Sequence, residues 1–191
     1  ANEKRIEKIK GKSLDSFSVG TAYFTVCVFP HGLWTLLKFC ITVIFKFFLA
    51  QYLRKIRLLK IPVKNVDHKL DDSVPFKPQT VHTYLDFINF WIRPLSMLVK
   101  RFGMIQGVKL EIEFLRYIRF VYQQAFEIYR KNMSTTRRPV CKEIKAVRRM
   151  QKADPHYMCV PSLHIAVICL TYTFYKKIFV RENFTKEEWQ N

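Results

Sequence analysis

The sequence predicts an all-α fold, a multi-helix bundle embedded in a membrane. Three apolar runs, at residues 22–53, 84–105 and 160–179, are each close to or longer than the roughly 20 residues that a membrane-spanning helix needs. Alternating strand patterns do not recur along the chain. The aromatic fraction of 15%, with 17 Phe and 5 Gly, is typical of a chain that contacts lipid. We therefore expect an integral membrane protein with a single domain over residues 1–191.

The first apolar run follows a basic N-terminal segment, and the two together occupy residues 1–53. The run contains Lys38 and Lys46. A lysine near the middle of a span costs about 2.5 to 3.5 kcal/mol on insertion scales unless it snorkels or faces a polar cavity. A basic stretch follows the run, and then a link rich in Asp and Pro at residues 71–78, which is typical of a turn region.

The second apolar run, at residues 84–105, has aromatic residues that suit the membrane interface. Tyr84 and Trp91 are the expected anchors. The pair Arg93-Pro94 is expected to break or kink this run near its middle, because proline removes a helical hydrogen bond.

A packed helix and a basic surface segment are expected next. Val108, Ile112 and Leu115 fall near helical spacing, so residues 108–129 are predicted to form a helix that is buried on one face. Residues 130–152 are polar and very basic, which favours a surface loop with one short helix.

Two helix starts are predicted towards the end of the chain. Pro161 is expected in the first turn of an apolar helix over residues 160–179, where its missing N–H leaves no bond unmade. Thr185 followed by Glu188 is typical of a helix N-terminus with a capping box. Because the chain stops at Asn191, soon after this start, we expect it to be truncated at the C-terminus.

The charge of the chain indicates anionic partners. It has 33 Lys and Arg against 15 Asp and Glu, a formal charge of +18, which suits phosphate esters, acidic lipid headgroups or nucleic acid. The five cysteines include no C-x-x-C pair and the histidines are scattered, so neither a disulfide framework nor a metal site is predicted. No cofactor is expected.

The start of the helix after Pro161 suits a phosphate. Free N–H groups and the helix dipole favour an anion there, and Ser162 adds a hydroxyl donor. His164 projects near the same end, where an imidazole that protonates a leaving oxygen typically contributes about 10² to 10⁴-fold. Upstream, Arg138 can hold two phosphate oxygens and Lys131 can act as a point charge. These four side chains are predicted to converge on one pocket.

Each of these residues also has a simpler interpretation. Lys131 and Arg138 are two cations among many in a basic segment, and they can be solvated surface charges. Ser162 can serve only as the cap of its helix. His164 can be a packed helix residue. The sequence leaves these alternatives open.

Two short motifs carry a resemblance to a known family. Residues 131–139, K-N-M-S-T-T-R-R-P, fit the K-(x)6-R-P signature of the type 2 phosphatidic acid phosphatase superfamily, and residues 161–164, P-S-L-H, are similar to its P-S-G-H signature. Leucine in place of glycine resembles the branch that includes inositol-phosphoryl transferases, as does the stretch D-S-V-P-F-K-P at residues 72–78. The resemblance covers about residues 71–179.

The third signature of that family, S-R-(x)5-H-(x)3-D, is absent from the chain. His68 with Asp72 and His82 with Asp86 match H-(x)3-D, but both pairs precede the first motif and lack the Ser-Arg, so they are treated as chance matches. In the family this signature supplies the nucleophilic histidine that forms a phosphohistidine intermediate. We expect the missing signature to lie beyond Asn191 in a longer parent chain.

The resemblance implies roles for the residues that are present. Lys131 and Arg138 would bind the substrate phosphate, Ser162 would hydrogen-bond it, and His164 would protonate the leaving group. The expected function is a membrane-associated phosphatase or phosphotransferase that acts on lipid phosphate esters through a phosphohistidine, incomplete in this chain.

A function from another class remains as the alternative. It is a non-catalytic basic module that binds anionic lipid or nucleic acid by charge. The sequence has no aromatic ribonucleoprotein pattern, zinc-finger spacing or heptad zipper, so the expected partners are a membrane and a phosphate ester, not nucleic acid.

Overall fold

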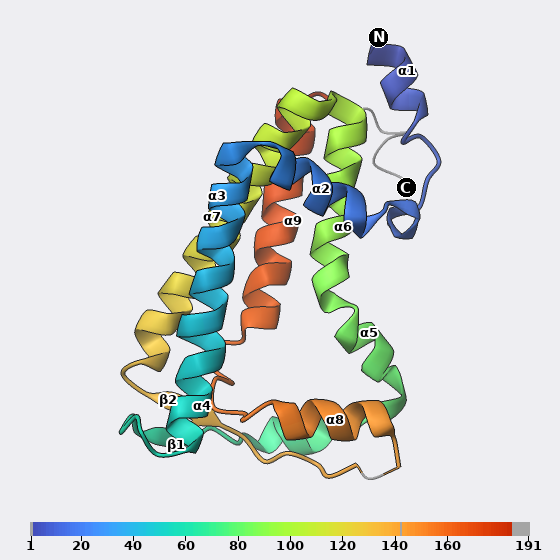
Figure 1. Cartoon of the computed structure of the whole chain (residues 1–191). Coiled ribbons are helices and arrows are strands. Elements are labelled where there is room, and N and C mark those ends of the chain that lie inside the picture. Colours follow the sequence, from blue (N-terminus) through green and yellow to red (C-terminus); the bar gives the residue numbers. More distant parts are fainter. Residues whose placement is uncertain (1, 142, 185–191) are drawn as a thin grey trace. The chain divides into compact units, whose positions relative to one another are not determined.

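The structure, a computed structural model, describes residues 2–141 and 143–184 and is mostly helical, at 70% of residues (Figure 1). The prediction that the chain is mainly helical is confirmed. The helix start predicted at Thr185 lies outside the described residues. The chain divides into two compact units, each assembled from segments that are far apart in the sequence.

Unit 1 comprises Ala1–Cys40, Phe87–Phe120 and Val167–Asn191. Its core is apolar, and Leu98, Phe114 and Val167 have no exposed surface. Gly103 adopts φ +80 in the turn between two of its helices, a conformation that glycine adopts without steric cost. Its helices are α1 (Asn2–Glu7), a 3₁₀ turn (Leu14–Ser16), α2 (Val19–Val28), most of α3 (Pro30–Ile41), α6 (Phe87–Phe102), the first part of α7 (Met104–Tyr129) and most of α9 (Leu163–Arg181).

Unit 2 comprises Ile41–Asp86 and Val121–Ala166 and contains all four predicted site residues. Ala50, Ala125, Tyr129, Met133, Met158 and Leu163 form its main buried cluster. Besides the end of α7 and the start of α9, it contains a π-helical stretch (Thr42–Leu49), α4 (Ala50–Lys55), β1 (Val63–Asn65), 3₁₀ turns (Lys69–Ser73 and Pro78–Thr80), α5 (Val81–Leu85), β2 (Met133–Thr135) and α8 (Lys145–Ala153).

The strands β1 and β2 were not predicted. They pair in parallel, with Val63 opposite Met133 and Asn65 opposite Thr135. Three residues are too few to display the alternation by which a strand is recognised, and the partner strand lies far away in sequence. The expected surface loop at residues 130–152 does contain a short helix, α8, so that part of the prediction is confirmed.

Within the described residues, two helices are long and apolar enough to cross a membrane, Pro30–Lys55 and Leu163–Arg181. The first begins at Pro30 and not at residue 22, because α2 ends at Val28 and the chain starts a new helix at the proline. The two lysines inside this helix, Lys38 and Lys46, lie over aromatic rings. The Lys38 Nζ is 4.9 Å from the centre of the Trp34 ring and the Lys46 Nζ is 5.4 Å from that of Phe126, and such contacts stabilise a cation away from bulk water.

The second apolar run does not meet the same criteria for a span within the described residues. It is shared between α5 and α6, and the last turn of α6 carries Lys100 and Arg101. The break predicted at Arg93-Pro94 is wrong, because α6 continues through Pro94. The buried side chains that flank the proline, including Ile92 and Leu95, stabilise the helix by packing and offset the missing hydrogen bond.

Candidate functional site

The two sequence motifs lie side by side in unit 2, joined by the buried Ser134 of β2. The Ser134 N–H donates to the carbonyl of Tyr157 at 3.0 Å, and the N–H of Cys159 donates to the Ser134 carbonyl at 3.3 Å. The Ser134 hydroxyl accepts from the Val160 N–H at 2.7 Å and donates to the Val160 carbonyl at 3.1 Å. The middle of K-(x)6-R-P is thus hydrogen-bonded to the segment directly before P-S-L-H.

A second contact joins the motifs at the end of α7. The hydroxyl of Tyr129, a side chain that is 1% exposed, donates to the carbonyl of Pro161. Tyr129 lies two residues before Lys131, and Pro161 directly precedes Ser162. The two motifs are therefore joined at two points, Ser134 to Val160 and Tyr129 to Pro161, by partly buried hydrogen bonds that are costly to break without a replacement partner.

Loss of the Ser134 hydroxyl is expected to destabilise this arrangement. In Ser134→Ala the N–H and carbonyl of Val160 lose a partly buried partner, at a cost of about 1 kcal/mol in the free energy of unfolding. Chemical denaturation measures the change. Ser73→Ala is the matched control, because the Ser73 hydroxyl bonds the Leu70 carbonyl at the exposed surface. Equal losses in the free energy of unfolding for the two variants would contradict a stabilising role for the Ser134 hydrogen bonds.

Ser162 is the cap of α9, and the prediction that Pro161 occupies the first helical turn is wrong. The Ser162 Oγ accepts a hydrogen bond from the Ile165 N–H at 3.4 Å, and the helix begins at Leu163. Serine is a favoured capping residue, so its hydroxyl, and not the proline ring, defines the start of the helix. The hydroxyl hydrogen of Ser162 remains available to donate to an anion.

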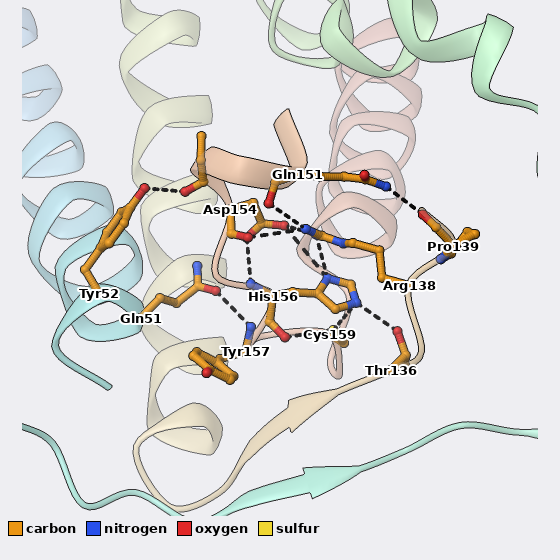
Figure 2. A network of polar contacts seen from close by, with 11 residues as sticks. Gln51, Tyr52, Thr136, Arg138, Pro139, Gln151, Asp154, His156, Tyr157 and Cys159 are labelled. Atoms are coloured by element: carbon orange, nitrogen blue, oxygen red, sulfur yellow. Dashed lines mark hydrogen bonds and ion pairs between the residues drawn. The ribbon is translucent and has the colours of Figure 1, made fainter. Parts of the chain in front are cut away.

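Arg138 is the centre of a polar network (Figure 2). Its Nη1 donates to the carbonyls of Gln151 and Asp154 at 3.2 and 3.3 Å. Its Nη2 donates to Asp154 Oδ2 and contacts Nδ1 of His156 at 2.8 Å. Both terminal nitrogens of the guanidinium are thus directed at residues 151–156, and the Asp154 carboxylate occupies the position where an arginine fork binds an oxyanion.

The segment that follows α8 is also held by α4. The Tyr52 hydroxyl donates to the carbonyl of Ala153, and the Tyr157 N–H donates to Oε1 of the buried Gln51 at 3.1 Å (Figure 2). These bonds lie on either side of Asp154 and His156. The network around Arg138 is therefore part of a fixed loop.

His156 is a residue of this network that the sequence analysis did not single out. Its backbone is left-handed, at φ 62, which is uncommon for a residue other than glycine and often marks a functional site. The His156 N–H donates to Asp154 Oδ1 at 3.1 Å, and its Nε2 lies 3.0 Å from Thr136 Oγ1. Cys159 Sγ is 3.5 Å from the same nitrogen. The Asp-Pro-His sequence alone carries no signal for this arrangement.

The charges of Asp154 and His156 stabilise one another. Burial alone would raise the pKa of Asp154, but hydrogen bonds from His156 and Arg138 outweigh it and lower the pKa from 3.8 to about 2. The Asp154 carboxylate, with a smaller contribution from Cys159, raises the pKa of His156 from 6.5 to about 9. Nδ1 of His156 lies 3.8 Å from Asp154 Oδ2.

Arg138 and Asp154 favour different protonation states of His156 Nδ1. Arg138 Nη2 is a donor and requires a lone pair on Nδ1, whereas the Asp154 carboxylate favours a proton there. The 2.8 Å contact between Arg138 Nη2 and Nδ1 requires that Nδ1 carry no proton. We expect protonation of Nδ1 to favour a bond to Asp154 over this contact. Titration of His156 is therefore coupled to the position of Arg138.

This pair predicts how stability depends on pH. The contribution of Asp154, whose pKa is lowered, is present above its ordinary pKa of 3.8 and is lost as the pH falls towards about 2. The contribution of His156, whose pKa is raised, is full below 6.5 and is lost as the pH rises through about 9. We expect melting temperatures to decline as the pH rises from 6.5 to above 9, and the decline to shrink in Asp154→Asn. A decline that is unchanged in this variant would contradict the pairing.

His164 is within electrostatic range of the same carboxylate. Asp154 interacts electrostatically with His164 and with the hydroxyl of Tyr84, which also interacts with Arg138. The ring of Tyr84 stacks on that of His164, with centroids 4.7 Å apart and planes at 28°. Tyr84, expected as an interfacial anchor, is thus a second site residue whose role in the site was missed.

Lys131 is not seen to join the other predicted residues. It is exposed just after α7, and its side chain makes no hydrogen bond or ion pair with a described residue. Asp154 interacts electrostatically with both Arg138 and His164, and Ser162 follows Pro161, whose carbonyl accepts from Tyr129. The role of Lys131 stays a prediction.

A mainly apolar groove of about 470 Å³ adjoins the site in unit 2. It lies against α8 and the segment at residues 71–84. Tyr84, Gln151 and Pro139 belong to both the groove wall and the surroundings of Arg138 and His164. The other lining residues are Asp71, Val74, Pro75, Phe76, Lys77, Pro78, Thr80, Val81, Val147 and Met150.

The described residues contain no group of three or more His, Cys, Asp or Glu side chains arranged to hold a metal ion. His68, part of a chance H-(x)3-D match, caps a 3₁₀ turn by accepting from the Leu70 N–H at 3.2 Å. Comparisons of the chain with protein-family models, with curated proteins and with solved structures found no match.

Proposed function

We propose that unit 2 binds the phosphate group of a phosphate ester with Arg138, His164 and the start of α9 at Ser162, the phosphate taking the place that the Asp154 carboxylate has on Arg138. The observation that carries the proposal is the hydrogen bonding of Ser134 to Val160, which joins the two halves of the site. An oxyanion can be bound by the groups that are present. These are the start of α9 with the Ser162 hydroxyl, the arginine fork of Arg138 and the imidazole of His164.

In this proposal Asp154 is the resident anion of the site. The phosphate takes the place of its carboxylate on Arg138 Nη2, and the guanidinium then faces phosphate oxygens. The charge on Arg138 is compensated in both states, so the exchange leaves no buried cation unpaired. The affinity for phosphate is reduced by the free energy needed to displace Asp154.

His164 supplies the proton for a leaving alcohol. Stacking on Tyr84 limits rotation of the imidazole, and a positioned acid is more effective than a mobile one. The chain contains no histidine in the context of the third family signature, so a nucleophile for phosphorus is not assigned. We accordingly expect phosphate binding with slow hydrolysis from these 191 residues.

The substrate class that we propose is a lipid phosphate ester, and the proposed location is a membrane. Support comes from the two helices that are long and apolar enough to span a bilayer, and from the apolar groove next to Tyr84. The activity would be that of a phosphatase or phosphotransferase of the type 2 phosphatidic acid phosphatase kind, to which the two motifs are similar.

The second candidate function is binding without catalysis. It is favoured by the Arg138 network, in which both terminal nitrogens already have partners within the protein. If Arg138 only holds the loop at residues 151–156, the basic surface would bind anionic lipid by charge alone. Vanadate binding to the full chain in detergent, compared between Arg138 and Arg137 variants, tests the first proposal against the second.

A further inference from the structure

Four cations form one row along α8. Lys145, Arg148, Arg149 and Lys152 follow the spacing i, i+3, i+4 and i+7, which places them on one face of a helix. All four are exposed, and none makes a side-chain hydrogen bond or ion pair with a described residue. The helix itself, K-A-V-R-R-M-Q-K-A, contains no acidic residue. We call this row the α8 basic face.

The opposite face of α8 fixes the direction of the basic face. Val147 is 2% exposed and packs in a cluster with Val81 and Cys141, and Ile144, Ala146 and Met150 pack against the same cluster. Rotation of α8 would expose these apolar side chains. The cations are therefore held outwards, side by side, where like charges three and four residues apart repel. A row of this kind becomes favourable when an anionic surface neutralises it.

The position of α8 in unit 2 identifies the anionic surface. Unit 2 contains the end of one candidate span, at Lys55, and the start of the other, at Leu163. If both helices span a membrane, the remainder of unit 2 lies at one membrane face. The segment after the first span is also basic, with Arg57 and Lys60 exposed. A headgroup layer is thus the anionic surface closest to α8.

We propose that the α8 basic face binds the anionic headgroups of the leaflet at which unit 2 lies. The inference rests on the proposed membrane location but not on the proposed phosphate site. Binding of α8 there would hold Asp154 and His156, which come directly after the helix, at the level of the headgroups. Each cation near a negatively charged leaflet adds to the attraction, and the attraction weakens with salt.

The test is hydrogen exchange of the full chain in nanodiscs of phosphatidylcholine, with or without phosphatidylserine. We expect α8 amides to exchange several-fold more slowly when phosphatidylserine is present, and the difference to vanish in high salt. The variant with Lys145, Arg148, Arg149 and Lys152 all changed to Gln should lose the difference. A control changes two other exposed lysines of the same unit, Lys64 and Lys69, to Gln and should keep it.

Three results would overturn the inference. Exchange of α8 that is independent of phosphatidylserine, although the chain is inserted in the discs, would reject the basic face as a lipid contact and leave the membrane location intact. Failure of the chain to enter the discs would reject both. Protection of α8 by added RNA, with none from phosphatidylserine, would assign the face to nucleic acid.

Discussion

Arg138→Ala is expected to lower the affinity of the full chain for vanadate or phosphate by about 100-fold. The variant removes the guanidinium that would hold the oxyanion, and a hydrogen bond to a charged group contributes about 1.5 to 3 kcal/mol, where each 1.4 kcal/mol is about tenfold in affinity. Isothermal titration with vanadate measures the change. Arg138→Lys keeps the charge without the fork and should retain part of the affinity.

Arg137→Ala is the matched control for this experiment. Arg137 is the adjacent arginine, it is exposed, and its side chain pairs with Asp72 and not with the 151–156 segment. The two variants remove the same charge from neighbouring positions. Equal loss of affinity in both would show that phosphate binding depends on the overall positive charge, and the site would be abandoned. Circular dichroism of each variant verifies that the helices persist.

Asp154→Asn is expected to strengthen phosphate binding by about tenfold, or about 1.4 kcal/mol. The substitution removes the resident negative charge from Arg138 Nη2 and from the neighbourhood of His164, while the carbonyls of residues 151 and 154 still bind Nη1. An incoming dianion then meets no carboxylate to displace or to repel it. Vanadate titration and the stability of the unliganded variant are measured together.

The unliganded Asp154→Asn variant should at the same time be less stable than the parent chain. Arg138 and His156 lose their carboxylate partner, and only a bound anion restores it. Asp72→Asn, which breaks the exposed pair with Arg137, is the control and should leave vanadate affinity within about twofold, since surface pairs contribute little. Weaker vanadate binding in Asp154→Asn would mean that Asp154 positions Arg138 for the ligand and does not compete with it.

Much of the helical architecture could be predicted because it depends on local patterns. The spacing of Val108, Ile112 and Leu115 predicted the helix that the structure shows as α7, and the apolar run after Pro161 predicted α9. The errors in the helix predictions arose at prolines. The first apolar run was taken as continuous through Pro30, where the structure begins a new helix, and Pro94 was expected to interrupt a helix that continues through it. The effect of a proline depends on what the helix packs against.

The candidate site was only partly accessible from the sequence. The order and spacing of the motifs pointed to Arg138, Ser162 and His164, because arginine, a helix cap and histidine have chemistry that is independent of context. Asp154, His156 and Tyr84 gave no comparable signal. The role of His156 depends on its left-handed backbone. The role of Tyr84 depends on its stacking on His164, a residue 80 positions away in the sequence.

The sequence by itself determined the helical class, the excess of cations and the two apolar helices, since each follows from composition or from a period of 3.6 residues. The tertiary structure alone decided which groups meet. A hydrogen bond forms only when donor and acceptor lie about 3 Å apart in a suitable direction, and residues 13 to 18 positions apart, such as Arg138 and its partners at 151–156, meet that condition only through the fold of the loop between them. The contact between Arg138 and Asp154 is therefore a property of the folded chain.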